Sequence, residues 1–460
     1  MLPTPRPAAP PSLSLVPPST RQVNPNRAEV HRIVIVGGGA GGLELATRLG
    51  RAFRRHGQAQ VVLIDRALKH LWKPLLHEVA AGSLDMANNE VDYLAHARRH
   101  HFQYQLGEVD GLDRQGRQVW LAPLLDDEGK LIAPRRAMPY DTLVLAMGSR
   151  VNDFGIAGVK EHALPLNTPD DARQFHQRLF WACVRAESDA SAHVDIAIIG
   201  AGATGVELAT ELRSTLRDYA QYAWSGQALD QRVRITLIEA GPRILGALPD
   251  KLAATALAEL QEQGITVLTN QRVNEVTETG VVCPGGRFVP AQLVVWAAGI
   301  KGPELIKSLA GLESTKGHQL VVRPSLQTTL DDRVFAMGDC ASCTLPDRER
   351  PVPPLAQAAQ QQARFLASSL RRVAAGRAPL DRFQFRDRGS VISLGHDNAA
   401  GSIVGVLTGR RFAIQGLFAK LTYWLLYRRY LAALHGVLRM VLTTAGDWLV
   451  RTGHRRVKLH

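Results

Sequence analysis

Two glycine-rich stretches of the sequence have the residue types that bind the phosphates of a dinucleotide. Both follow the pattern GxGxxG, with Gly37, Gly39 and Gly42 in the first and Gly200, Gly202 and Gly205 in the second. The first glycine permits a tight turn, the second lets backbone N–H groups approach a pyrophosphate, and the third lets a helix pack close to its strand. The start of that helix then faces the phosphates, so we expect two dinucleotide sites.

A carboxylate follows each glycine stretch at the distance expected for an acid that binds a ribose. Asp65 lies 23 residues beyond Gly42, and Glu239 has the corresponding place after the second stretch. A carboxylate about 4 Å from a 2′-phosphate would cost on the order of 4 kcal/mol at an effective dielectric constant of about 20. Glu239 therefore predicts NADH rather than NADPH as the second ligand, although Arg243 could weaken this preference.

Two other groups of side chains have spacings typical of redox or metal chemistry. Cys340 and Cys343 have the CxxC spacing of a thiol pair, but their position in the chain favours packing over a catalytic disulfide. His96 and His100 are one helical turn apart, with two arginines and no acid nearby. A dication would need acids or thiolates, so we predict a solvated basic face and no metal.

The elements that position the glycine stretches are alternating strands and helices. Residues 33–36 form an apolar run typical of a strand buried on both faces, and a helix begins directly after the glycines. Residues 37–47 match residues 200–210 at eight of eleven positions, an internal repeat at an offset of 163 residues. The repeat predicts that the two units share one architecture.

Three further apolar runs return the chain to these sheets. Residues 140–148 end in Gly148 and residues 293–299 end in Gly299, one run for each unit. Residues 334–339 form a third strand that ends in Gly338 and Asp339, and we expect a helix directly after it. Ligands bind at the carboxyl ends of strands in open α/β sheets, which places these residues near the ligands. Residues 102–136 predict a small antiparallel crossover, and residues 389–406 predict another hairpin.

The predicted fold class is α/β, with two Rossmann-like dinucleotide-binding domains and a C-terminal amphipathic-helical membrane-anchoring domain. The predicted boundaries are a disordered Pro-rich tail at 1–30, a discontinuous first domain at 31–165 and 320–388, a second domain at 166–319, and a membrane-association region at 389–460. Four cysteines among 460 residues are too few for a disulfide framework and suit a reducing compartment.

The C-terminal region carries much of the formal net charge of +13. Residues 410–460 have ten Arg and Lys against one acid, which predicts an anionic partner. Apolar residues recur there at helical spacing in two sets: Leu417, Leu421, Trp424, Leu425 and Leu431, then Leu434, Leu438, Val441, Ala445 and Leu449. These features favour amphipathic helices that lie on an anionic membrane surface over a spanning helix, which would bury Arg439 and Asp447.

Several longer motifs together resemble the bacterial type II NADH dehydrogenases, which are non-pumping NADH:quinone oxidoreductases. These are the two glycine stretches, HLWKPLLHEVAAGSLD, VWAAGIK, VFAMGDCASC and PPLAQAAQQ. The resemblance covers residues 31–460 and implies FAD in the first unit, NADH in the second, and a membrane quinone as final acceptor. It also implies the fold of the two-dinucleotide flavoprotein reductases.

The resemblance assigns roles to individual residues. For FAD these are Gly37, Gly39, Ala40, Gly41, Gly42, Asp65, Lys73, Gly148, Gly338, Asp339, Ala356 and Gln357. For NADH they are Gly200, Gly202, Ala203, Thr204, Gly205, Glu239 and Gly299. Gln357 and Gln361 match the glutamine pair at the quinone end, where a spacing of four places them on one helix face, and Lys420 is a further candidate quinone contact.

Glu207 is the candidate proton relay, because the family places this acid near the nicotinamide and quinone and a carboxyl with a raised pKa could donate a proton. Glu44 has the same place in the first unit, so such an acid could instead only complement a helix N-terminus. The sequence leaves both roles open.

The function implied is hydride transfer from NADH to FAD and then two electrons to quinone, at the cytoplasmic side of the cell inner membrane as a peripheral protein. Predicted partners are the quinone, an anionic lipid surface and a second copy of the chain, and no nucleic acid. Two alternatives remain: a soluble NADH-dependent reductase of an acidic electron-transfer protein, and a redox sensor that holds FAD and NADH without turnover.

Overall fold

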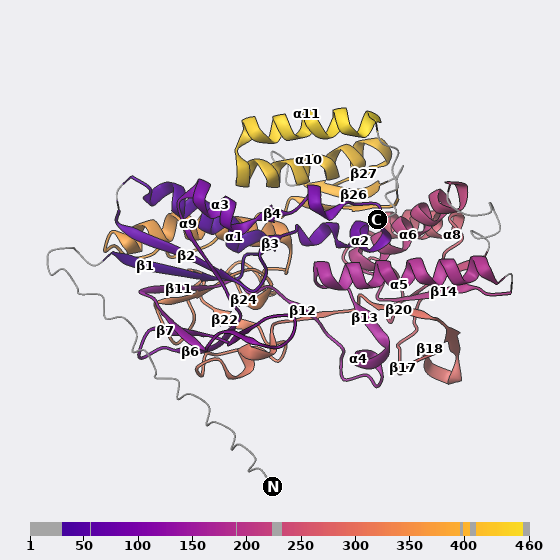
Figure 1. Cartoon of the computed structure of the whole chain (residues 1–460), viewed down its shortest axis with the longest axis horizontal. Helices are drawn as coiled ribbons and strands as arrows, with labels where there is room; N and C mark the ends of the chain where they lie inside the picture. The colour runs from indigo at the N-terminus through magenta and orange to yellow at the C-terminus, as the bar shows by residue number, and fades with distance from the viewer. Residues whose placement is uncertain are drawn as a thin grey trace, which may run out of the picture. The chain divides into compact units, whose positions relative to one another are not determined.

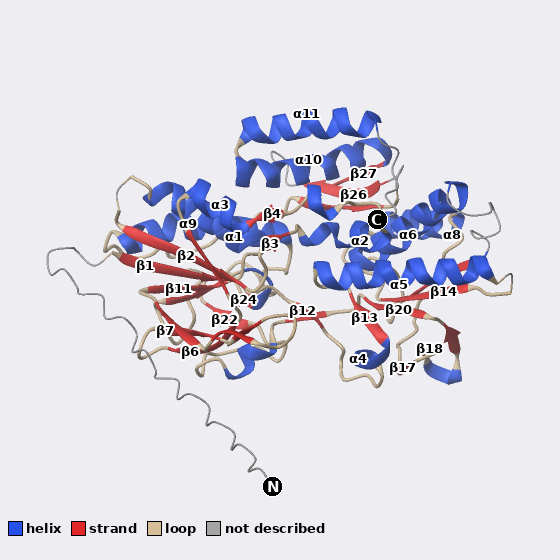
Figure 2. Cartoon of the chain, viewed as in Figure 1, coloured by secondary structure: helices blue, strands red, loops and turns tan. Residues whose placement is uncertain are grey.

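The computed structural model describes residues 30–55, 57–189, 191–222, 232–395, 399–404 and 411–453. The predicted tail at 1–30 lies outside these residues apart from Val30. The helices are α1 Ala40–Phe53, α2 Leu76–Ala81, α3 Tyr93–His100, α4 Val159–His162, α5 Pro169–Ser188, α6 Ala203–Tyr222, α8 Asp250–Glu262, α9 Ala356–Ala374, α10 Gly416–His435 and α11 Val437–Gly453. Figure 1 shows their places along the chain, and Figure 2 separates them from the strands.

The strands form two five-stranded sheets and several small ones. They are β1 His31–Val36, β2 Ala59–Asp65, β3 Lys69–His70, β4 Val91–Asp92, β5 Gln103–Leu106, β6 Val109–Asp113, β7 Gln118–Leu121, β8 Leu124–Leu125, β9 Leu131–Ala133, β10 Arg136–Pro139, β11 Thr142–Leu145, β12 Arg150–Val151, β13 Ala163–Pro165, β14 Val194–Ile199, β15 Val233–Ile238, β16 Thr266–Leu268, β17 Glu275–Thr277, β18 Gly280–Val282, β19 Phe288–Pro290, β20 Leu293–Trp296, β21 Ile300–Lys301, β22 Leu320–Val322, β23 Val334–Ala336, β24 Ala341–Cys343, β25 Gly389–Ser393, β26 Ala399–Val404 and β27 Arg411–Gln415.

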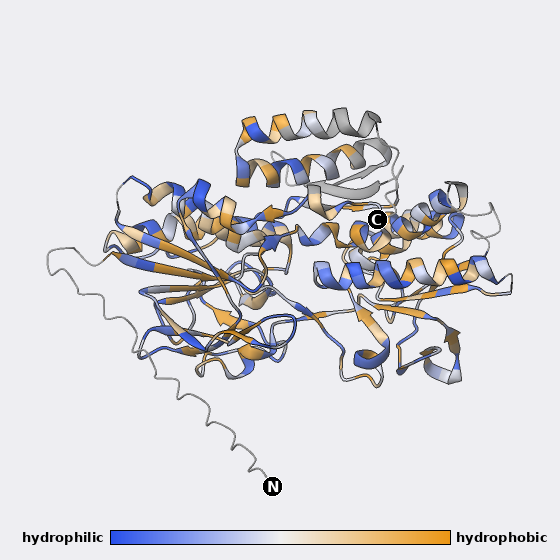
Figure 3. Cartoon of the chain, viewed as in Figure 1, coloured by the Kyte–Doolittle hydropathy of each residue, from blue (hydrophilic) through white to orange (hydrophobic). Residues whose placement is uncertain are grey.

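The two large sheets have matching strand orders. The first is β23-β11-β1-β2-β5 and the second is β13-β20-β14-β15-β16, and every pairing in both is parallel. The repeated strands β1 and β14 lie at the centre, where apolar runs such as Ile33–Ile35 are buried on both faces because helices cover a parallel sheet. The prediction of two parallel Rossmann-like units is confirmed. Figure 3 shows orange residues along these strands.

The crossover between β5 and β11 is antiparallel, as predicted: β6, β7 and β10 pair in the order β10-β7-β6. The prediction of a helix directly after Gly338 and Asp339 is wrong. A single 3-10 turn at Gly338–Cys340 leads into β24, which pairs with β22. The long helix that reaches this point is α9, which begins after Pro353 and Pro354.

The C-terminal region begins with the predicted hairpin, β25 and β26, to which β27 adds a third antiparallel strand. Two helices follow. Gly436 separates them with φ 88°, a left-handed conformation that suits glycine at a helix end. The predicted second stripe is therefore wrong at its start, because Leu434 belongs to α10 and is buried. No helix in the described part of the chain is long and apolar enough to cross a membrane.

The two faces of α10 have different surroundings. Tyr430 and Leu434 are buried in the core of the first unit, whereas Leu421, Trp424 and Leu425 are 51%, 39% and 51% exposed. Packing of one face on the protein therefore leaves an apolar face uncovered by the described residues.

The prediction of a solvated basic face at His96 and His100 is wrong. Both side chains are buried, and burial lowers the pKa of His96 to about 2 and that of His100 to about 4. His96 Nε2 lies 2.8 Å from Thr47 Oγ1, and Arg51 donates to His100 Nδ1 over 3.0 Å. Among the described residues no group of three His, Cys, Asp or Glu side chains could hold a metal ion.

Candidate active site

The first glycine stretch forms the turn from β1 into α1. Gly37 has φ 102°, and its N–H donates to Ile64 O at 2.8 Å. A Cβ on Gly42 would overlap the Gly37 carbonyl oxygen, so only glycine lets the helix approach the strand this closely. Gly39 has open space in front of it, and α1 has neither a side-chain cap nor an acid in its first turn. The backbone N–H groups of Ala40 and its neighbours can therefore receive phosphate oxygens, which fits the pyrophosphate of FAD.

Asp65 joins the end of β2 to this turn. Its carboxylate accepts a hydrogen bond from Gly38 N at 2.6 Å and another from Ala67 N at 2.9 Å. Burial raises the pKa of Asp65, and these hydrogen bonds oppose the shift. The sequence did not reveal Tyr93, whose hydroxyl donates to Gly38 O at 2.7 Å from α3.

The second glycine stretch repeats this geometry. Gly200 has φ 102°, and a Cβ on Gly205 would overlap the Gly200 carbonyl oxygen. The carboxylate of Glu239 accepts hydrogen bonds from Ala201 N and Gly241 N, both at 2.8 Å. The same sequence pattern has therefore produced the same turn twice, each held by an acid from the next strand.

Other residues predicted at the NADH site lie around this turn. Ala203 and Thr204 are exposed at the start of α6. Gly299 follows β20 with φ 64°, and its carbonyl accepts from Asn152 N. Arg243 instead donates to the carbonyls of residues 246 and 248. Because its guanidinium is held there, it offers little compensation for the charge of Glu239.

Asp339 lies close to other residues that were predicted to bind the flavin and ribityl end of FAD. Ser149 donates to Asp339 Oδ2 at 2.8 Å, which brings the neighbouring Gly148, with φ 68°, beside the Gly338 turn. Lys73 lies close enough that the Asp339 carboxylate opposes the desolvation that lowers its pKa. The ammonium of Lys73 donates to Asn167 Oδ1 at 2.7 Å. The sequence did not single out Ser149, although it directly follows the predicted Gly148.

Helix α9 connects this site to the C-terminal region. Gln362 is buried, and its Oε1 accepts from Gly338 N at 2.7 Å. On another face, Gln357 accepts from Arg388 N and donates to Gly389 O, while Gln361 accepts from and donates to the backbone of Arg386. Ala356 is the first residue of the helix. The predicted quinone pair thus clasps residues 386–389, and sequence analysis missed the role of Gln362.

Glu207 lies on α6 between the second glycine turn and the C-terminal hairpin. Its carboxyl accepts from Ser393 N of β25 at 3.2 Å and lies 3.8 Å from His77 Nδ1. Burial, together with the charges of Glu78 and Glu211, raises the pKa of Glu207 to about 8, while burial lowers that of His77 to about 4. At neutral pH the carboxyl therefore retains its proton and can donate it.

The predicted cysteine pair and Lys420 lie in different parts of the chain. Cys340 and Cys343 are free and buried, and burial raises the pKa of each thiol to about 11, so they are packed and unreactive. Lys420 lies on α10, but its side chain is outside the described residues.

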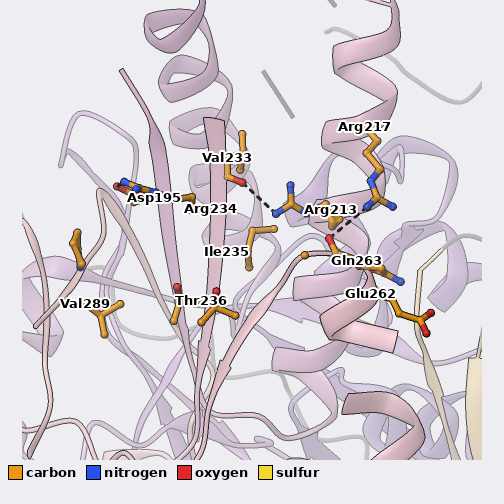
Figure 4. A pocket seen from close by; sticks show the side chains of 13 residues that line it. Asp195, Arg213, Arg217, Val233, Arg234, Ile235, Thr236, Glu262, Gln263 and Val289 are labelled. Atoms are coloured by element: carbon orange, nitrogen blue, oxygen red, sulfur yellow. Dashed lines mark hydrogen bonds and ion pairs between the residues drawn. The ribbon is translucent and has the colours of Figure 1, made fainter. Parts of the chain in front are cut away.

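A cavity of about 520 Å³ in the second unit is separate from these residues (Figure 4). It opens at the starts of β15 and β16, whereas the glycine turn follows the end of β14. Its arginines are engaged by the protein: Arg234 pairs with Asp195, and Arg213 and Arg217 donate to backbone carbonyls. Nothing about it indicates a ligand.

Comparisons with known proteins agree with this geometry. Residues 31–363 match the model of the pyridine nucleotide-disulphide oxidoreductase family. A Haemophilus influenzae protein named type II NADH:quinone oxidoreductase is 39% identical over 444 residues, which cover 93% of this chain and 99% of that protein. A Staphylococcus aureus protein of the same name is 27% identical over 81% of this chain and 90% of its own length. The solved structure of NDH2 from Plasmodium falciparum in complex with NADH has a TM-score of 0.78 at 16% identity and covers 93% of this chain and 100% of that chain.

Proposed function

Because this chain belongs to the pyridine nucleotide-disulphide oxidoreductases and, among them, to the type II NADH:quinone oxidoreductases, we propose that it passes electrons from NADH through FAD to a membrane quinone without pumping protons. The family resemblance predicted from the motifs is confirmed, and the chain is an NADH-dependent flavoprotein oxidoreductase. FAD, when bound, supplies the chemistry of accepting a hydride and releasing two electrons. The family membership supports our proposal that the electrons pass to a quinone and that no protons are pumped.

The observation that carries this proposal is the position of α9. Gln362 holds the Gly338 turn at the FAD end, while Gln357 and Gln361 hold residues 386–389, where the C-terminal region begins. Two faces of the first turns of α9 therefore contact the proposed flavin-binding turn and the proposed quinone end. This arrangement supports the proposed boundaries of 31–165 and 320–388 for FAD, 166–319 for NADH and 389–460 for the membrane.

In the proposed mechanism the residues of this chain bind, orient and supply a proton. The turns at Gly37 and Gly200 receive the two pyrophosphates, and Asp65 and Glu239 orient the riboses. Asp339 holds the ribityl end, with Lys73 beside it. Glu207 holds a proton at its carboxyl oxygen and delivers it to the quinone as the electrons arrive.

The proposed membrane contact is the exposed apolar face of α10 and α11. Leu421 and Leu425 on α10 and Leu438 and Val441 on α11 are all at least half exposed. Insertion of such a face into the lipid interface would hold the protein at the membrane surface without a spanning segment. We place it at the cytoplasmic side of the cell inner membrane, and a homodimer remains a prediction.

Anaerobic rapid mixing tests the electron path. NADH should bleach the flavin absorbance, and a short-chain quinone should restore it. The variants Gln357→Ala and Gln361→Ala should keep the first step and slow the second, because the clasp on residues 386–389 is lost. A flavin that bleaches and is not reoxidised by quinone would instead support the sensor alternative.

Vesicle co-sedimentation tests the membrane contact. Leu421→Glu/Leu425→Glu should release the protein from vesicles, because two charges enter its apolar face. The matched control is Leu131→Glu, at a residue that is 56% exposed in the crossover of the first unit. Unchanged binding by the double variant would favour the soluble-reductase alternative.

A further inference from the structure

Four arginines from three different elements meet beside the proposed quinone end. This arginine cluster consists of Arg364 on α9, Arg386 and Arg388 in the segment before β25, and Arg429 on α10. Besides burial, the charges of Arg364 and Arg386 lower the pKa of Arg388, and those of Arg388 and Arg364 lower the pKa of Arg429. Arg388 is therefore close enough to the other three arginines for their charges to repel, and at Arg429 the charge of Glu44 offsets part of this repulsion.

Protein acids neutralise this cluster only in part. Arg364 Nε lies 3.0 Å from Glu44, but that fully buried carboxylate also pairs with Arg48 at 2.8 Å. Asp387 accepts from Gln357 and from the N–H of residue 389. Among the described residues no carboxylate forms an ion pair with the guanidinium groups of Arg386, Arg388 or Arg429. A bound anion would relieve their repulsion. A guanidinium group suits a phosphate because it can donate two parallel hydrogen bonds to the phosphate oxygens.

A cavity of about 310 Å³ opens at this cluster. Arg364 and Arg388 line it together with Phe365 and Phe383, so it offers charge and apolar surface at once. Its volume falls at the lower end of the range for small-molecule sites.

The surface next to the cluster is apolar. Leu425 and Leu426 lie four and three residues before Arg429 on α10, one helical turn away, and are 51% and 42% exposed. Leu421 continues this row one turn further on. A ligand that satisfies both surfaces must have a phosphate at one end and hydrocarbon at the other. An acidic protein would match the charges but would leave the leucines unexplained.

We propose that the arginine cluster is a binding site for the headgroup of an anionic phospholipid whose acyl chains lie along Leu425 and Leu421. This site rests on the membrane contact of the proposed function and adds to it residues outside the C-terminal helices. Gln357 and Gln361 clasp the segment that carries Arg386 and Arg388, so the lipid would also hold the proposed quinone end in place.

The test compares full-length holoenzymes on phosphatidylcholine vesicles with and without phosphatidylglycerol. Arg388→Gln and Arg429→Gln should each weaken binding to phosphatidylglycerol vesicles by about tenfold, which is the loss of one charge-assisted hydrogen bond. Arg439→Gln is the matched control, because Arg439 is exposed on α11 outside the cluster. It should weaken binding by less than about fivefold, the effect of one charge near an anionic surface.

Three results would overturn the site. Equal losses in Arg439→Gln and Arg429→Gln would indicate diffuse attraction, as would full rescue by Arg388→Lys, which keeps the charge but not the planar donor pair. Displacement by inorganic phosphate at constant ionic strength would make it a site for free phosphate. If only the lipid site is wrong, the wild-type protein still binds phosphatidylcholine vesicles and still reduces quinone in detergent. A wild-type protein that does neither would reject the proposed function.

Discussion

Glu44 and Glu207 have the same place in the two repeated units but opposite surroundings. Both lie in the second turn of the helix that follows a glycine turn with the same φ of 102°. Glu44 forms ion pairs with Arg48 and Arg364. Glu207 has no Lys or Arg partner among the described residues, and its pKa is raised to about 8. The repeat therefore fixes the backbone of the site, while neighbouring elements decide whether the acid is ion-paired, as Glu44 is, or has a raised pKa, as Glu207 has.

The neighbours that make this difference come from distant parts of the chain. Arg364 reaches Glu44 from α9, whereas Glu207 meets His77 from α2 and Ser393 from β25. Tyr423 of α10 also lies near Glu207. Burial raises the pKa of the Tyr423 phenol, and the charge of Glu207 raises it further. The proposed proton donor thus belongs to the unit whose glycine turn we propose to bind NADH, and it contacts β25 of the C-terminal region.

The largest expected difference between the units follows from Gly42→Ala and Gly205→Ala. Each added Cβ would overlap a backbone carbonyl, and such overpacking costs about 1–3 kcal/mol. Gly42→Ala should lose most of its flavin during purification, measured by absorbance. Gly205→Ala should keep its flavin and show a KM for NADH raised about tenfold or more. Loss of flavin from both variants would mean that the two turns do not bind separate dinucleotides.

The second prediction contrasts the two acids that we propose to bind the riboses. Glu239→Gln removes a charge that would repel a 2′-phosphate, so the preference for NADH over NADPH in kcat/KM should fall by about 100-fold to 1000-fold. Asp65→Asn, its counterpart in the first unit, should leave that ratio unchanged. Steady-state kinetics with both nucleotides measures the two ratios. A preserved preference in Glu239→Gln would assign specificity to another residue.

Features set by neighbouring residues were predicted better than features set by contacts between distant parts of the chain. The glycine turns, their acids, the parallel strands and the hairpin at β25 follow from short-range spacing, because backbone conformation depends on neighbouring residues. The exposure of His96 was mispredicted, since other elements contact it, including Thr47 of α1 by a hydrogen bond and His435 of α10 by ring packing. The roles of Gln362 and Ser149 depend on contacts across 24 and 190 residues, which no local pattern reports. The difference between Glu44 and Glu207 is of this long-range kind.

The third prediction isolates the proton on Glu207. Glu207→Gln should slow flavin reoxidation by quinone about 100-fold, which is the usual effect of losing a general acid. Flavin reduction by NADH should stay within about twofold. In the wild-type protein reoxidation should decline as pH rises through about 8, where the carboxyl loses its proton. Glu44→Gln is the matched control, and a similar slowing there would assign the effect to packing.

The last expected effect concerns stability, and it separates the two acids most directly. Glu44→Gln leaves two partly exposed guanidinium groups without their shared partner and should lower the free energy of unfolding by about 1–3 kcal/mol at neutral pH.

For Glu207 the sign depends on pH. Its folded pKa of about 8 lies above the ordinary glutamate value of 4.5, so the folded protein binds the proton more tightly. The resulting stabilisation is complete below about pH 4.5 and is lost as pH rises through about 8, whereas Glu207→Gln lacks this dependence. Urea unfolding across this range should therefore show the wild type losing stability relative to Glu207→Gln. Parallel curves would mean that folding does not raise the pKa of Glu207, and the contrast between the two units would disappear.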